Sequence, residues 1–356
     1  MSSPSQKKRI EALDYLRGYF IVVIIIDHLE RWPSLLSVFT GKGLLWSNAS
    51  DGFIITAGLL VGYIRGYKAR DTPFKDIAKK LLLRSFWLYV WSVLATLLLF
   101  SFTTLFPFPD NVPHYDFAAN SFFDLIHDTI LLEYIHPWVY FLHLYTVYLL
   151  LSIGAVWLLR KNLWWIIALC VVGAFIYTTF ATSPWIERAP IFFIPVIIGY
   201  YLDAIKAFIL NLNKRKMIIL QGGLLALFVS TLLFSIGTVF LPQLFPETLI
   251  SWLRSIFSRD PINFIVVVVA AIWYIGLFIT FHYTLPFLKK YLAWLILPFS
   301  TGSFSAYTVH GVPLILLMTY SPFPDNIFMN TIAGFAAVVA VLFIIKLPFI
   351  KRVIPQ

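Results

Sequence analysis

The chain has 356 residues, of which 60% are hydrophobic and only 12% are charged. Soluble domains carry about 25% charged residues, so this composition excludes an ordinary soluble protein and indicates a polytopic membrane protein with one domain over 1–356. The formal net charge of +10 would suggest nucleic-acid binding in a soluble protein. Here most lysines and arginines fall in short loops on one side of the predicted spans, so we expect no nucleic acid as a partner.

Runs of about 20 hydrophobic residues mark the predicted membrane helices. No internal repeat, low-complexity tract or linker rich in glycine, serine and proline interrupts the pattern. The expected fold is therefore all-α, with about ten transmembrane helices embedded in the lipid bilayer. The predicted spans are 13–31, 45–65, 77–105, 138–159, 163–182, 190–210, 217–241, 262–286, 291–320 and 327–348.

The positions of lysine and arginine predict the orientation, because short cytoplasmic loops are enriched in both. With ten spans, the basic clusters all fall on one side, which is then cytoplasmic, and both termini lie inside. The first apolar segment contains Arg17 and is not followed by a small-residue cleavage site, so no cleavable signal peptide is expected. Cys170 is the single cysteine, which excludes an intrachain disulfide. We expect an integral protein of a bacterial inner membrane.

The segment 118–136 does not fit this series of spans. It is amphipathic and too polar to cross the membrane. We predict an interfacial or re-entrant helix on the outer side. Irregular backbone is tolerated at membrane depth only where it lines a cavity or is covered by protein.

The first predicted helix carries two ionisable residues, Arg17 and His28, within its apolar run. Ionisable groups in a span are costly and are retained mostly where they act or pair. Eleven residues separate the two, which is close to three helical turns, so both lie on one stripe about 16 Å apart along the axis. Arg17 would lie near the cytoplasmic face and His28 toward the other. Asp14, three residues before Arg17, is an alternative partner for it.

Lys80 and Arg84 lie one turn apart on the third predicted helix and join Arg17 near the cytoplasmic face. Guanidinium and ammonium groups bind phosphates through charge-assisted hydrogen bonds, so this inner cluster suits a polyanion. The alternative for Lys80 and Arg84 is that they are ordinary snorkelling cations.

A second polar cluster is predicted in the outer half of the membrane. Histidine titrates near neutrality and can take a proton from a hydroxyl, so the cluster suits acid–base chemistry centred on His28. Asp51 is a better candidate to orient His28 than Asp27, which points about 100° away from His28 and could pair with Arg31. The other members are Asn48, Ser50, His136, Trp138, Ser303, Ser305, Tyr307 and His310.

The remaining histidines and the aromatic residues leave alternatives open. His136 and His310 are balanced between a role in the site and a structural role, whereas His143 and His282 are expected to be structural. The aromatic content of 18% is mostly packing and interface belt, although Trp138 could stack on a sugar.

Three motifs carry a resemblance to a known family. The first is Leu13-Asp14-Tyr15-Leu16-Arg17-Gly18 followed by His28, the second is the basic stretch 79–84, and the third is Ser-Phe-Ser-Ala-Tyr-Thr-Val-His at 303–310. They resemble the Arg-x10-His signature, the basic start of the third helix and the late Ser-Tyr-Ser-x-Tyr-x-x-His helix of the acyltransferase-3 superfamily. The adjacent pair Asp27-His28 is similar to the branch that succinylates periplasmic glucans.

Two positions depart from the family pattern. Lysines stand at 79–80 where a pair of arginines is common, and Ala57-Gly58-Leu59 stands where the family has Ser-Gly-Phe. The second difference argues against a catalytic serine on the second helix.

The resemblance implies an acyl-CoA donor, acetyl-CoA or succinyl-CoA, whose phosphates would meet Arg17, Lys80 and Arg84 from the cytoplasm. It implies a hydroxyl of an extracytoplasmic carbohydrate or glycolipid as acceptor, and His28 as the catalytic residue. A succinyl donor would require a further cation near His28, for which Arg31 and Lys42 are the candidates. No metal is expected.

The mechanism predicted from the residues is acyl transfer to a hydroxyl. His28 removes the acceptor proton while Asp51 or Asp27 holds its imidazole, or His28 itself carries the acyl group. Tyr307, Ser303 or His310 could stabilise the oxyanion. The residues expected to contact the acceptor are His136, Trp138, Ser303, Tyr307 and His310.

Two other classes of function compete with the enzyme. A proton-coupled transporter of a small solute or glycan precursor could use His28, Asp27 and Asp51 as a proton relay, but secondary transporters usually show inverted repeats, and none is found. A non-catalytic membrane sensor or scaffold is the third possibility, and its function would not depend on Arg17 or His28.

Overall fold

The computed structural model describes residues 10–354 except 106–112, 114, 116–120, 182, 260 and 321–325. The described residues form helices and no strands, which confirms the all-α prediction for this part of the chain. The helices are α1 (Glu11–Leu29), α2 (Ser37–Thr40), η1 (Gly41–Gly43), α3 (Ala49–Leu60), η2 (Val61–Tyr67), α4 (Phe74–Leu105), α5 (Phe122–Ile130), η3 (Pro137–Val139), α6 (Tyr140–Arg160), α7 (Trp164–Tyr177), α8 (Pro184–Glu187), α9 (Ala189–Tyr200), α10 (Leu202–Leu210), α11 (Lys214–Phe240), η4 (Pro242–Leu244), α12 (Glu247–Ile256), α13 (Phe264–Tyr291), α14 (Ala293–Thr301), α15 (Ser303–Val309), α16 (Gly311–Tyr320), α17 (Ile327–Lys346) and α18 (Pro348–Val353).

Fewer helices than predicted are long and apolar enough to cross a membrane. Among the described residues five helices meet that test, and six do so if the pair Trp185–Tyr200 and Leu202–Leu210, bent by 63°, counts as one span. The expectation of about ten spans is therefore not met by length and composition. The five are Phe74–Leu105, Pro137–Arg160, Lys214–Phe240, Phe264–Tyr291 and Ile327–Lys346.

The missing spans have identifiable physical causes. The predicted span 291–320 is divided into α14, α15 and α16, and the predicted span 45–65 begins as α3 and continues as the π-helix η2. α7 has only 14 residues. α1 is a continuous helix of 19 residues, but it carries Glu11, Asp14, Arg17 and Asp27. The average hydropathy of these segments is high enough to predict spans, but it is not sensitive to breaks in a helix or to single charged residues.

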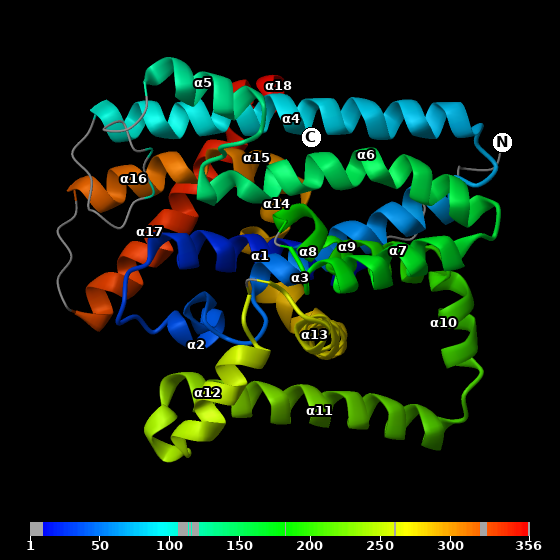
Figure 1. Cartoon of the computed structure of the whole chain (residues 1–356). Coiled ribbons are helices and arrows are strands. Elements are labelled where there is room, and N and C mark those ends of the chain that lie inside the picture. The colour runs from blue at the N-terminus through cyan, green and yellow to red at the C-terminus, as the bar shows by residue number, and fades with distance from the viewer. Residues whose placement is uncertain are drawn as a thin grey trace.

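α1 lies at the centre of the helix packing, with α3, α13, α14 and α17 against it (Figure 1). Its side chains Leu16, Ile21 and Ile25 are almost completely buried. Gly18 allows the backbone of α14 to approach, since a Cβ at this position would overlap the carbonyl oxygen of Ile296. The helix that carries Arg17 and His28 is thus held by protein on several sides.

α3, η2 and α9 form a second tight contact. Gly58 and Gly62 face α9, and a Cβ at Gly62 would overlap the carbonyl oxygen of Val196. Small residues spaced by four are the usual means by which membrane helices bring their backbones together. The Ala57-Gly58-Leu59 sequence is therefore part of a helix–helix interface.

The predicted polar helix in 118–136 is found as α5, which packs on α4 (Figure 1); residues 118–120 lie outside the described residues. Ser121 caps α5, and its backbone and side-chain hydrogen bonds to the Asp124 carboxylate lower the pKa of that group. Phe122 and Phe123 are exposed while Leu125 and Thr129 are buried, so the helix is amphipathic.

α11 lies with α12 on the side of the molecule opposite α4 and α5 (Figure 1). It packs mainly on α13, and only 6% of its most apolar stretch is buried in the protein. A helix this apolar and this exposed has most of its surface available to lipid.

Candidate active site

His28, in the last turn of α1, lies beside His310, which directly follows α15. The Nδ1 atom of His28 is 2.8 Å from Nε2 of His310, and the two ring centroids are 5.1 Å apart. Trp138 of η3 stacks on His28 at 6.0 Å between centroids and 13° between planes. Residues 282 positions apart in the chain therefore form one cluster.

The hydrogen bonds of this pair determine where the ring protons lie. Nδ1 of His310 is 2.7 Å from the carbonyl oxygen of Tyr307. A carbonyl only accepts, so Nδ1 of a neutral His310 carries the proton and its Nε2 is an acceptor. Nδ1 of His28 then donates to that Nε2. In the neutral pair, Nε2 of His28 is left with a lone pair, which is the form that a general base requires.

His136 lies two residues before Trp138, and both of its ring nitrogens are at hydrogen-bond distance from backbone groups. Its Nδ1 accepts from the backbone N–H of Trp138 at 3.2 Å, and its Nε2 lies 3.2 Å from the carbonyl oxygen of Pro113. The proton of the neutral ring is therefore on Nε2, and both ring nitrogens have partners. These hydrogen bonds fix the turn that carries Trp138 and support a positioning role for His136, while its contact with the acceptor stays a prediction.

Tyr307 contributes its backbone to the site and its side chain to packing. The ring is buried, with Phe141 5.5 Å away and Phe53 6.5 Å away between centroids. Ser303, at the start of α15, is partly exposed. The late motif thus supplies His310 to His28, and the Tyr307 carbonyl to His310.

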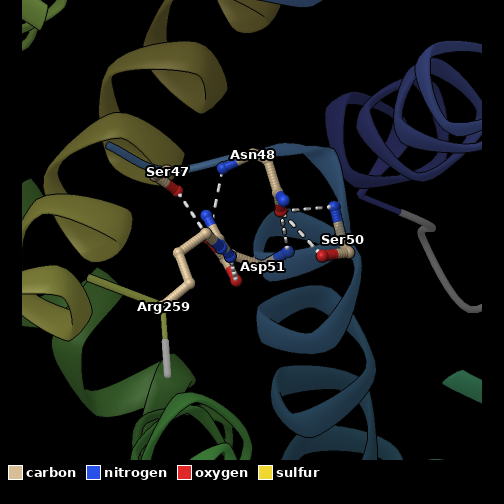
Figure 2. A network of polar contacts seen from close by, with 5 residues as sticks. All are labelled: Ser47, Asn48, Ser50, Asp51 and Arg259. Atoms are coloured by element: carbon tan, nitrogen blue, oxygen red, sulfur yellow. Dashed lines mark hydrogen bonds and ion pairs between the residues drawn. The ribbon is translucent and has the colours of Figure 1, made fainter. Parts of the chain in front are cut away.

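Asp51 does not orient His28, because the structure gives its carboxylate other partners (Figure 2). It is completely buried, caps α3 in a capping box with Asn48, and accepts from the Ser47 hydroxyl at 3.1 Å. Nη2 of Arg259 lies 2.7 Å and 2.9 Å from its two oxygens. The expectation that Asp51 holds the imidazole is corrected: the contact is His310, and Arg259 was not singled out from the sequence.

Asp27 faces away from His28, as the helical angle predicts. Its carboxylate is hydrogen-bonded to Thr40 and lies beside Gly43, and its Oδ1 is buried with no partner among the described residues. Arg31 donates to the carbonyl of Leu317 at 3.0 Å. Neither residue contacts the His28 ring in the described structure, so an orienting role for Asp27 is not supported either.

The three cations predicted to bind phosphate lie at two separate places in the structure. Arg17 donates a hydrogen bond to the carbonyl of Ser300, at the end of α14. Lys80 and Arg84 are exposed on α4, and Arg84 lies close enough to Arg65 of η2 for their charges to interact. Sequence reasoning did not single out Arg65, because it lies in a separate basic cluster and only the packing of η2 brings it near α4.

One group of metal-type ligands lies outside this cluster. His127, Asp128 and Glu133, at the end of α5, place one ligand atom each within 4.8 Å of the others. The His127 side chain is 64% exposed, and exposed acidic groups of this kind commonly carry no ion. They have no contact with the His28 cluster among the described residues.

Comparison with known proteins gives one match. A family model described as "OpgC protein" matches residues 9–347, which is nearly the whole chain. No curated protein and no solved structure matches.

Proposed function

The chain belongs to the OpgC protein family, and on that premise we propose that it is an integral-membrane acyltransferase that moves a succinyl or acetyl group from acyl-CoA to a hydroxyl of an extracytoplasmic glucan. OpgC proteins are a membrane-associated succinyltransferase family, which favours succinyl-CoA as the donor. The motifs at 13–28, 79–84 and 303–310 add the narrower proposal of kinship with the acyltransferase-3 superfamily.

One observation carries the proposal: the chain of hydrogen bonds from the Tyr307 carbonyl through His310 to His28. It supports a neutral His28 with an unprotonated Nε2. The arrangement resembles a catalytic triad in which His310 and a carbonyl take the place of the carboxylate. Because neither partner carries a charge, we expect weaker stabilisation of the imidazolium than an aspartate would provide.

The proposed reaction balances with these groups. Nε2 of His28 takes the proton of the acceptor hydroxyl as the oxygen attacks the thioester carbonyl. The tetrahedral intermediate collapses to the ester and expels the coenzyme A thiolate, which takes the proton back from His28. Trp138 stacks on His28 and is almost completely buried, so we propose that it holds the His28 ring in place. We retain Ser303 as the candidate donor to the oxyanion.

The donor is proposed to enter from the side of Arg17, Lys80, Arg84 and Arg65. α1 is continuous between Arg17 and His28, so their separation of about 16 Å along the axis follows from the helical rise. A pantetheine arm is long enough to bridge this distance. Phosphates would then lie near the cations while the thioester reaches His28, and the bound geometry would supply rate through proximity.

The test is release of coenzyme A thiol by the purified full-length protein in detergent. Succinyl-CoA and acetyl-CoA are each supplied with a glucan oligosaccharide, and wild type is compared with His28→Ala. Loss of the general base is expected to lower kcat by about 10²–10⁴-fold. His282→Ala is the matched control, because His282 is exposed on α13 and should leave the rate unchanged.

Two results would contradict the proposal. One is an unchanged rate of transfer in His28→Ala. The other is no ester formed by wild type with either donor while the protein carries a solute across a vesicle membrane, which would make it a transporter.

A further inference from the structure

A cavity of about 490 Å³ lies on the face of α1 that carries Tyr19 and Val23, away from the histidine cluster. Its walls are α1, α11, α13 and the segment 37–48. The volume is in the range of small-molecule sites. The proposed reaction does not use this cavity.

The long wall of the cavity is apolar. Phe228, Leu232, Ile236 and Phe240 line it at intervals of four residues, so they form one stripe along α11. At 1.5 Å per residue this stripe is about 18 Å long, close to the ~15 Å depth of one bilayer leaflet. α13 faces it with residues that include Trp273 and Leu277. The wall therefore has the length and chemistry of a groove for one alkyl chain.

The other end of the cavity is polar and carries a cation. Lys42 lines it together with Ser37, Thr40 and Ser47. The Lys42 Nζ lies 5.6 Å from the ring centroid of Phe240, which is the last residue of the apolar stripe. Lys42 forms no ion pair with any described residue. An anionic group of a ligand bound at this end would lie near the ammonium group of Lys42.

Lys42 has an unusual backbone conformation. Its φ is 57°, in the left-handed region, between Gly41 at 63° and Gly43 at 65°. A residue with a side chain pays about 1 kcal/mol or more for this conformation. The ammonium group of Lys42 also lies 5.5 Å from the ring centroid of Trp32, so two aromatic rings flank the cation at this end of the cavity.

The rim of the cavity is apolar and exposed. Val38 and Phe39 line the cavity and expose 78% and 68% of their surface, and Leu44 next to Leu45 exposes 61%. Exposed apolar residues beside a cation are typical of a surface in contact with a lipid leaflet. α11 is itself nearly unburied on its other faces. The cavity thus opens where lipid is expected.

We propose that this cavity binds one acyl chain of an anionic phospholipid, with the chain along α11 and the phosphate at Lys42. A glucan fits this wall poorly, because its hydroxyls would find few hydrogen-bond partners there. Coenzyme A matches the charge, but its pantetheine amides would lie against the same apolar stripe. The proposal does not rest on the acyltransferase reaction.

The experiment uses the full-length protein in nanodiscs of phosphatidylglycerol and phosphatidylcholine in equal amounts. A trace of phosphatidylglycerol carrying a photoreactive diazirine at its chain end is cross-linked, and the labelled peptides are mapped. We expect label on peptides of α11 and α13. Leu232→Trp fills the groove and should reduce this label by about tenfold. Leu233→Trp is the matched control, because Leu233 is 62% exposed, and it should retain the label.

A charge variant provides an independent measurement. Lys42→Gln should lower the preference of the site for phosphatidylglycerol over phosphatidylcholine about fivefold, since one cation near a membrane surface contributes about 1 kcal/mol toward an anionic lipid. Equal labelling of Leu232→Trp and Leu233→Trp would overturn the proposal. So would loss of the label on addition of millimolar coenzyme A, which would assign the cavity to the donor.

Discussion

His310 determines the tautomer of His28, because among the described residues it accepts a hydrogen bond from Nδ1 of that ring. We predict that His310→Ala lowers kcat for acyl transfer by about 10–100-fold with little change in KM, since the base is present but is no longer held in the reactive tautomer. The measurement is steady-state transfer as a function of both substrates.

A conservative variant separates this positioning role from a loss of folding. In His310→Gln the side-chain oxygen can accept from Nδ1 of His28, so this variant should recover part of the rate lost in His310→Ala. The pH dependence of kcat should also differ between the two. Equal rates and equal pH profiles for His310→Ala and His310→Gln would show that His310 contributes only to packing.

Asp51 and Arg259 form a largely buried ion pair between residues 208 positions apart, and we predict that they act on stability. Asp51→Ala leaves a half-buried guanidinium without its carboxylate and removes the cap of α3, so it should lower the free energy of unfolding by about 3–5 kcal/mol. Thermal unfolding in detergent measures this. The double variant Asp51→Ala/Arg259→Met should lose less than the sum of the two single variants. Additive losses would contradict a direct coupling.

The residue proposed to act could be identified from the sequence more readily than the residues that contact it. His28 stands out because a histidine in an apolar run is costly unless it is used. Asp51 was expected beside it only because the two lie at similar depth. The sequence does not reveal that Asp51 is already engaged by Arg259, 208 residues later, or that His310 lies at hydrogen-bond distance from His28. Both are tertiary contacts with no local pattern.

At the scale of helices, the contact of η2 with α9 gives a matched pair of glycine substitutions. Gly62→Ala would force the carbonyl of Val196 to move and should destabilise the protein by about 1–3 kcal/mol. Gly222→Ala on α11 has no neighbouring atom within 4 Å and should be neutral or stabilising by up to about 1 kcal/mol through helix propensity. Melting temperatures of the two variants in one detergent test this, and a shared direction of change would contradict it.

Hydropathy predicted the positions of most helices but overestimated the number that span. A window of apolar residues does not distinguish one long helix from α14, α15 and α16 in succession, in which Gly302 and His310 mark the breaks. His310 lies between α15 and α16, and its ring is at hydrogen-bond distance from His28.

For the molecule as a whole, α1 carries the two ends of the proposed site, the cation of Arg17 and the proposed base His28. We predict that Arg84→Gln raises KM for succinyl-CoA about tenfold, because Arg84 is proposed to contact phosphate. The same variant should leave KM for succinyl-pantetheine, which lacks phosphates, unchanged. Lys161→Gln is the control for general loss of positive charge. An equal rise in KM for both donors would show that Arg84 does not bind the phosphates of the donor.

The distance in sequence between His28 and His310 also has a consequence in time. A chain is synthesised at about 5–20 residues per second, so His28 is in place roughly 15–60 s before the residue 282 positions later that fixes its tautomer. During this interval the nascent protein holds a histidine that lacks its hydrogen-bond acceptor. On the proposed mechanism, chains that stop before residue 310 would therefore transfer acyl groups at a reduced rate, as expected for His310→Ala.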